Sequence, residues 1–237
     1  MTYRTSKTRR AFDHSIEQIA KVIKASKANN YTIDHKEYIH AAAVFLAHAE
    51  VENYFSDVLD DLAKLYSKHS SNSQALPKSL RAHLLLTKSN MIRLVGEKIA
   101  GGSEVNLIEK ISTHLCSTHA FAADSSYSIA GFSGKDIYQN QKYPSPENIE
   151  KVLARIGIKN ASNNINRVAR KDAVALFESV ASLRTALAHN ASLPGMSQQD
   201  IVNRIMGAKI FVAALDRLLF EHLKTTHTAV QWKNEMT

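Results

Sequence analysis

The segment from Asp34 to Lys68 constrains the fold most, because neither glycine nor proline interrupts it. Asp34, followed three residues later by Glu37, forms the capping-box pattern that starts a helix. A helix of roughly 35 residues spans about 50 Å at a rise of 1.5 Å per residue. So long an element predicts a scaffold against which the other helices pack.

The rest of the chain predicts further helices, and nothing in it indicates a strand. A polar connector at 70–77 and a loop at 124–145 separate them, and the short segment "ASLPG" makes the last two antiparallel neighbours. We therefore expect one all-α domain over residues 1–237, with an inserted segment at about 70–145. The helices expected besides the long one cover residues 8–28, 78–100, 104–123 (capped by Ser103), 146–156 (capped by Ser145), 167–190 and 197–224 (capped by Ser197).

Composition restricts the class of protein. A single cysteine, Cys116, excludes an internal disulfide framework and favours a reducing compartment. The N-terminus lacks the apolar region of a secretory signal, and the least polar stretch is interrupted by His40, His48 and Glu50. We expect a cytoplasmic protein with no membrane partner. The net charge of +8 favours a polyanion such as RNA, although an inert basic surface explains it equally well.

An arginine followed five residues later by a histidine occurs three times, at Arg9/His14, Arg184/His189 and Arg217/His222. The pattern alone therefore selects no site. Context favours Arg184 and His189, which lie among small and apolar residues at a helix end, just before a Pro-Gly turn. The first pair lies in a segment that can fray, and the third lies among ordinary surface charges.

The stretch "SLRTALAHN" resembles the R-x4–6-H signature of the HEPN superfamily, an all-α fold found in many ribonucleases. "HAEVENYFSDVLDDLA" is similar to an early helix of the RiboL-PSP-HEPN and related groups, and "PSPENIEKVLARIGIKN" is similar to the segment before their Arg-His helix. The likeness covers about residues 38–68 and 144–223. Many members carry a polar residue, often Asn, directly after the arginine, where this chain has Thr185.

The resemblance implies metal-independent endoribonuclease activity without a cofactor, in which the ribose 2′-hydroxyl attacks the adjacent phosphate and leaves a cyclic phosphate. His189 is the expected acid or base, and Arg184 is expected to hold the phosphate. Glu52 is the expected acidic partner of these two residues. Thr185 and Asn190 are expected to contact substrate. The family serves stress response, toxin-type growth arrest and antiphage defence, so an antitoxin is a further expected partner.

Geometry adds a condition to this site. Five residues along a helix rotate a side chain by about 140° and raise it by about 7.5 Å, so one straight helix does not point both side chains at one atom. Members of the family solve this by forming homodimers whose two motifs face one cleft. An isologous dimer is therefore expected to be part of the mechanism.

Several alternatives stay open. Glu52 is equally explained as a charge on an exposed helix face, and Asn190 as a helix cap. The cluster of His114, Cys116 and His119 suggests a metal site, but on a helix these side chains diverge, so no metal is expected. The tyrosines of 127–143 either stack on bases or anchor a loop. The rival function is a non-catalytic HEPN-fold module that binds RNA or another protein.

Overall fold

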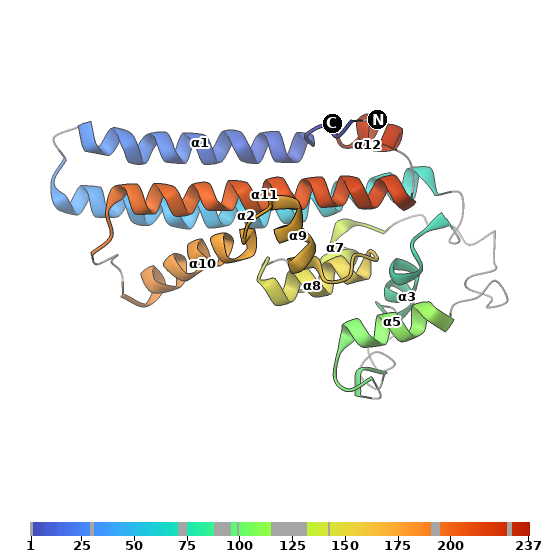
Figure 1. The fold of residues 1–237 in the computed structure, drawn as a ribbon. Helices are drawn as coiled ribbons and strands as arrows, with labels where there is room; N and C mark the ends of the chain where they lie inside the picture. The colour runs from blue at the N-terminus through green and yellow to red at the C-terminus, as the bar shows by residue number, and fades with distance from the viewer. Residues whose placement is uncertain are drawn as a thin grey trace. The chain divides into compact units, whose positions relative to one another are not determined.

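The computed structural model describes residues 2–28, 31–70, 75–87, 96–98, 100–114, 132–141, 143–190, 195–226 and 229–237 (Figure 1). Throughout these ranges the regular structure is helical and no strand is present, so the predicted all-α fold class is confirmed. The helices are α1 (Lys7–Ala28), α2 (Ile33–His69), α3 (Lys78–Thr87), α5 (Glu104–His114), α7 (Gly134–Tyr138), α8 (Pro146–Arg155), α9 (Ala161–Ala169), α10 (Ala173–Asn190), α11 (Gln198–Thr226) and α12 (Ala229–Glu235).

The chain divides into two compact units. Unit 1 comprises Met1–Phe55, Asn163–Lys224 and Thr237, and unit 2 comprises Ser56–Ser162 and Thr225–Met236. The expectation of a single domain over 1–237 stays a prediction. Among the described residues, no helix combines the length and the apolar character needed to cross a membrane.

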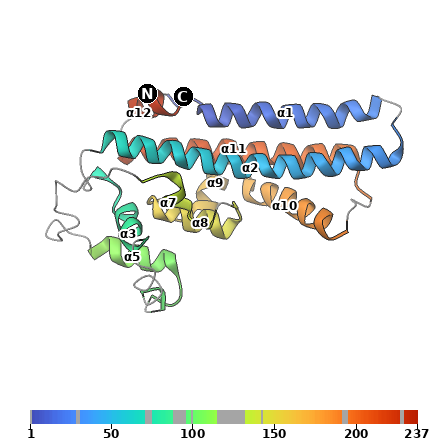
Figure 2. The ribbon, with the colours of Figure 1, turned by 180° about the vertical axis from the view of Figure 1, so that it is seen from behind.

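Unit 1 is built on α1, the first part of α2, and α11, which run side by side in both views (Figures 1 and 2). The i, i+4, i+7, i+11 spacing of Phe12, Ile16, Ile19 and Ile23 predicts one apolar stripe on α1. Phe12, Ile16 and Ile23 are buried and Ile19 is partly buried, so the stripe faces the core. The chain then runs along α10 and returns along α11. These two helices approach closely at Gly207 of α11, which has no Cβ. A Cβ added there would lie 3.2 Å from the Cβ of Leu176 on α10.

A buried carboxylate ties the N-terminal segment to this unit. Asp216 of α11 is fully buried and accepts hydrogen bonds from the hydroxyls of Tyr3 (2.6 Å), Ser6 (2.5 Å) and Tyr54 (3.2 Å). The Ser6 backbone N–H also donates to it, at 3.2 Å. Because Tyr54 belongs to α2, Asp216 joins the N-terminus, α2 and α11 at one point.

Unit 2 also contains a buried charge pair. Arg155 of α8 is fully buried and donates to both carboxylate oxygens of Glu104 on α5, at 2.6 and 3.1 Å, and to the carbonyl of Ile137 on α7, at 2.6 Å. His83 of α3 lies 3.8 Å from the same carboxylate. The guanidinium therefore links α5, α7 and α8 through a polar core.

Three helix boundaries differ from the predictions. The helix expected over 167–190 is broken at Arg170, whose φ of 57° ends α9, and Asp172 then caps α10 by accepting from the Ala175 N–H at 3.0 Å. Thr32, not Asp34, caps α2 by accepting from the His35 N–H at 3.4 Å. The loop expected at 124–145 contains α7. Local capping by a neighbouring polar residue decided each of these boundaries.

The other predicted caps are confirmed. Ser145 accepts from the Asn148 N–H at 3.2 Å, and Pro146 is the first residue of α8. Ser197 caps α11 by accepting from the Asp200 N–H at 3.1 Å, and Ser103 caps α5 by accepting from the Asn106 N–H at 3.3 Å. The helix predicted over 78–100 is described as α3 and again at 96–98, and residues 88–95 lie outside the described part of the chain.

Candidate functional site

The second half of α10 presents the predicted pair to solvent. Leu183 and Leu187 are buried, at 4% and 5% exposure, and so they fix which face of α10 points inward. Arg184 and His189 are both exposed, as the packing of these leucines requires. Neither the Arg184 guanidinium nor the His189 imidazole makes a hydrogen bond or ion pair with another described residue. Both side chains are therefore available to a ligand.

A second histidine, on α2, lies within electrostatic range of Arg184, and an acidic residue contacts that histidine. Glu52 and His48 are one turn apart, and Nδ1 of His48 lies 3.3 Å from Oε1 of Glu52. The His48 side chain is 4% exposed and that of Glu52 is 31% exposed, so this contact runs from the core to the surface. Unit 1 thus holds a carboxylate and a buried imidazole in contact on α2 and, on α10, a guanidinium that pairs with no described residue.

The pKa of His48 reflects these neighbours. Burial lowers the pKa of His48 below its usual 6.5, the negative charge of Glu52 raises it, and the positive charge of Arg184 lowers it further. The net shift is downward, so the imidazole is neutral near pH 7. The contribution of Arg184 also places its guanidinium within electrostatic range of His48.

Thr185 and Asn190 are the two residues expected to contact substrate, and the structure describes the side chain of Thr185 only. The Thr185 hydroxyl is exposed and donates to the carbonyl of Ala181 one turn earlier, at 3.1 Å. Phosphate oxygens accept hydrogen bonds, so this proton has to leave Ala181 before Thr185 can donate to a phosphate. Asn190 is the last residue of α10, and its side chain lies outside the described part of the structure.

Sequence reasoning missed His48, which it treated only as an interruption of an apolar stretch. One signal was available, since His48 and Glu52 have the i, i+4 spacing that places two side chains together on a helix. That spacing did not reveal which of the two is buried, and burial is what separates their roles.

An apolar surface lies next to these residues on α2. Tyr38, Phe45 and Leu46 are 77%, 42% and 55% exposed. At 100° per residue, Tyr38, Ala42, Phe45 and Ala49 fall on one side of α2, with Leu46 next to them and Glu52 at their edge. We call the five apolar residues the α2 stripe: Tyr38, Ala42, Phe45, Leu46 and Ala49. Exposed large apolar groups clustered in this way are typical of an interaction surface.

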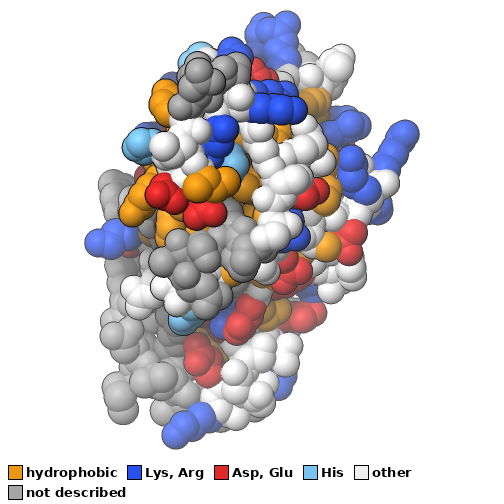
Figure 3. All heavy atoms as spheres, turned by 90° about the vertical axis from the view of Figure 1, so that its left-hand side faces the viewer, with side chains coloured by type: hydrophobic (Ala, Val, Ile, Leu, Met, Phe, Trp, Pro, Cys, Tyr) orange, Lys and Arg blue, Asp and Glu red, His pale blue; other side chains and the backbone are white. Residues whose placement is uncertain are grey.

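Basic side chains of unit 1 also lie away from α10. Exposed Lys21, Lys24 and Lys27 lie along the end of α1. Figure 3 shows Lys and Arg side chains over the upper part of one face of the molecule and at other places on it. In Figures 1 and 2, α1 and α10 lie on opposite sides of α11. The positive charge therefore does not by itself locate a site at Arg184.

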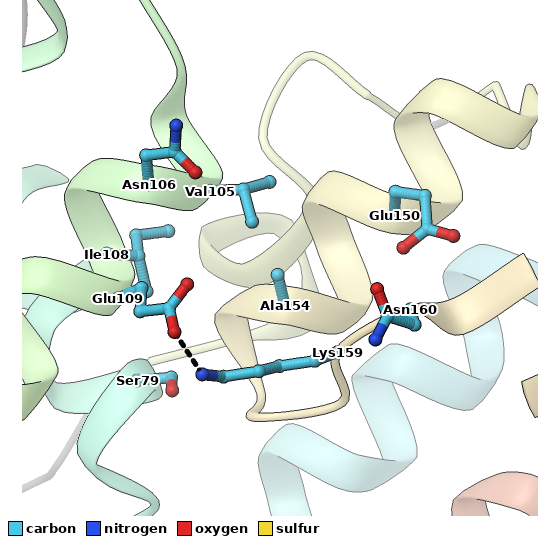
Figure 4. Close-up of a pocket in the computed structure, with 9 residues that line it drawn as sticks. All are labelled: Ser79, Val105, Asn106, Ile108, Glu109, Glu150, Ala154, Lys159 and Asn160. Atoms are coloured by element: carbon cyan, nitrogen blue, oxygen red, sulfur yellow. Dashed lines mark hydrogen bonds and ion pairs between the residues drawn. The ribbon is translucent and has the colours of Figure 1, made fainter. Parts of the chain in front are cut away.

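Unit 2 contains a separate hollow of about 360 Å³ (Figure 4). Lys159 crosses its mouth and pairs with Glu109 at 2.5 Å. Glu150 faces it as well, but its two oxygens accept from the N–H groups of Ala161 and Ser162, at 2.8 and 2.7 Å, and so cap α9. No residue of the predicted site lines this hollow.

The suggested metal cluster lies largely outside the described residues. Cys116 and His119 are not described, and neither is the side chain of His114. Within the described ranges, no group of three His, Cys, Asp or Glu side chains could hold a metal ion.

Comparison with known proteins identifies one family. The family model RiboL-PSP-HEPN matches residues 10–221, which include both helices of the candidate site. HEPN domains are often RNA-related and generally nuclease-related. No curated protein and no solved structure matches the chain.

Proposed function

The chain belongs to the RiboL-PSP-HEPN family, and on that premise we propose that it is a metal-independent endoribonuclease whose site contains Arg184, His189 and Glu52. The observation that carries the proposal is the exposed Arg184 guanidinium, which has no partner among the described residues and lies within electrostatic range of His48. An exposed arginine that pairs with no described carboxylate is suited to bind a planar or branched anion such as phosphate.

The proposed reaction balances without metal or cofactor. The ribose O2′ attacks the adjacent phosphorus while the P–O5′ bond breaks, giving a 2′,3′-cyclic phosphate and a 5′-hydroxyl. A base takes the proton of the 2′-hydroxyl, and an acid gives a proton to the leaving O5′. An imidazole such as His189 can do either near neutral pH, and Arg184 would stabilise the charge on the phosphate oxygens.

A second copy of the chain completes the site in this proposal. Because α10 is a continuous helix, Arg184 and His189 diverge by about 140° around its axis. Two copies related by a two-fold axis would bring the arginine of one protomer toward the histidine of its partner. The exposed α2 stripe supports this arrangement, since it offers an apolar contact surface directly beside Glu52.

The proposal is tested by incubating the purified protein with RNA and analysing the ends of the products. Wild type should give cyclic phosphate ends, and His189→Ala and Arg184→Ala should lose cleavage by at least roughly a hundredfold. His14→Ala and Arg217→Ala are matched controls, because each removes the same residue type from another copy of the Arg-His spacing. Equal activity in His189→Ala and His14→Ala refutes the catalytic assignment.

A non-catalytic RNA-binding or protein-interaction module is the second candidate. The observation that favours it is the Thr185 hydroxyl, which donates to Ala181 rather than toward a ligand. In that case Arg184→Ala weakens RNA binding while no cyclic phosphate forms with wild type. The proposed biological role is toxin-type growth arrest or antiphage defence, with an antitoxin or other regulator as partner. Growth arrest on expression of wild type but not of His189→Ala would support that role.

A further inference from the structure

We infer that His48 is a positioning residue, which holds the Glu52 carboxylate in place so that this carboxylate can orient the guanidinium of Arg184 on RNA. This inference rests on the proposed function. It assigns a role to a residue that the Arg-His signature does not contain, on a helix different from the one that carries that signature.

Burial separates the role of His48 from that of His189. The His48 side chain is 4% exposed, and its neighbours on α2, Val44, Ala47 and Val51, are fully buried. An imidazole in this position does not reach RNA, so it takes no part in proton transfer to substrate. Its rotamer is set by close packing, which makes it a fixed point against which a more mobile side chain can be held.

Glu52 is the side chain that needs such a fixed point. At 31% exposure it lies at the edge of the core, and a glutamate there has several rotamers available. Its Oε1 lies 3.3 Å from Nδ1 of His48, whereas no described residue donates to Oε2. One oxygen thus contacts the packed imidazole, which leaves the other for the guanidinium of Arg184 in the proposed arrangement.

The charges around His48 agree with separate roles for His48 and Glu52. The charged groups that act on His48 are Glu52, from α2 itself, and Arg184, from α10. A neutral imidazole that carries its proton on Nδ1 donates to Glu52 without neutralising it, so the carboxylate keeps its full attraction for Arg184. A protonated His48 would compete with Arg184 for the same carboxylate and repel the guanidinium.

The test measures RNA binding separately from cleavage. A 2′-O-methyl RNA oligonucleotide lacks the attacking hydroxyl, and fluorescence anisotropy gives its Kd for each variant. His48→Leu should raise the Kd roughly tenfold, since a hydrogen bond to a charged group contributes about that much. His48→Asn, whose amide can donate from near the Nδ1 position, should restore most of the affinity.

Two further variants distinguish positioning from a general loss of structure. Glu52→Gln changes only a partly exposed group and should weaken binding by the same factor, and adding His48→Leu to it should cause little further loss. His40→Leu is the matched control, because it removes another histidine of α2 whose pKa is lowered by burial and which lies near Glu37. It should leave the Kd unchanged.

Nuclear magnetic resonance of ¹⁵N-labelled protein gives a readout that needs no RNA. His48 should carry its proton on Nδ1 in wild type, and this preference should weaken in Glu52→Gln. Three results would overturn the role of His48 and leave the proposed function standing. They are an Nε2-protonated His48, additive effects in the double variant, and an unchanged Kd in a folded His48→Leu protein. Failure of wild type to bind RNA overturns the proposed function, and with it this role of His48.

Discussion

Replacing Asp216 with asparagine tests whether one buried carboxylate holds unit 1 together. The carboxylate receives four hydrogen bonds, two at each oxygen. Oδ1 accepts from the hydroxyls of Ser6 and Tyr54, and Oδ2 accepts from the Tyr3 hydroxyl and the Ser6 N–H. An asparagine has one acceptor oxygen and one NH₂ donor. The NH₂ group cannot accept a hydrogen bond, so the Ser6 and Tyr54 hydroxyls must turn and accept from it, and all four contacts lose the negative charge.

The magnitude follows from the loss of charge at these four contacts. A hydrogen bond to a charged group contributes about 1–1.5 kcal/mol more than a neutral one, so four of them give about 4–6 kcal/mol. Removing a buried charge recovers part of this loss, and the partly exposed Tyr3 can turn toward water. We expect a net loss of about 3 kcal/mol in the free energy of unfolding. For a chain of this size that lowers Tm by roughly 6–12 °C.

The assay is urea and thermal unfolding followed by far-UV circular dichroism. Glu178→Gln is the control, because it makes the same carboxylate-to-amide change on an exposed side chain of α10 in the same unit. It should leave the unfolding midpoint almost unchanged. A loss below about 1 kcal/mol in Asp216→Asn would show that the surrounding hydroxyls find other acceptors, and would refute the reasoning.

Three further predictions concern unit 2, the effect of pH and the α2 stripe. Arg155→Met should cost about 3–5 kcal/mol in urea unfolding, because Glu104 is left buried without its partner, and a smaller cost contradicts the pairing. The folded pKa of His48 lies below its unfolded value, so stability is full above about pH 6.5 and falls as the pH drops toward the folded pKa. His48→Asn should lack that part of the decline when unfolding is compared at about pH 7.5 and about pH 5.5. Tyr38→Asp with Phe45→Asp should keep the stability within about 0.5 kcal/mol but give a monomer in sedimentation and abolish RNA cleavage, and an intact dimer would exclude the stripe as the interface.

Local chemistry made much of the helical fold predictable. The spacing of Phe12, Ile16, Ile19 and Ile23 identified α1 and the face that it turns to the core, and Ser145 and Ser197 identified the starts of α8 and α11. These signals act over one or two turns, so a single sequence contains them in full. Thr32 and Asp34 are two possible caps close together at the start of α2. The hydrogen bond from the His35 N–H to Thr32 identifies the cap, and the sequence pattern had indicated Asp34 instead.

The candidate site was predictable only in part. The order of motifs singled out Arg184 and His189 among three equal spacings, and it singled out Glu52 on a different helix. The role of His48 was not accessible, because a histidine in an apolar stretch has the same local signature whether it packs in the core or points to solvent. The charge of +8 also did not locate the site, since exposed lysines gather on α1.

The sequence by itself determined that the chain is helical, that it belongs with HEPN domains, and which arginine and histidine are candidates, because periodicity, caps and short motifs are local properties. Only the tertiary structure decided that His48 is buried while Glu52 reaches the surface, that Arg184 of α10 comes within electrostatic range of His48 on α2, and that Asp216 accepts from Tyr3, Ser6 and Tyr54. The physical reason is that burial and charge proximity depend on which helix faces pack together, and no residue carries that information alone.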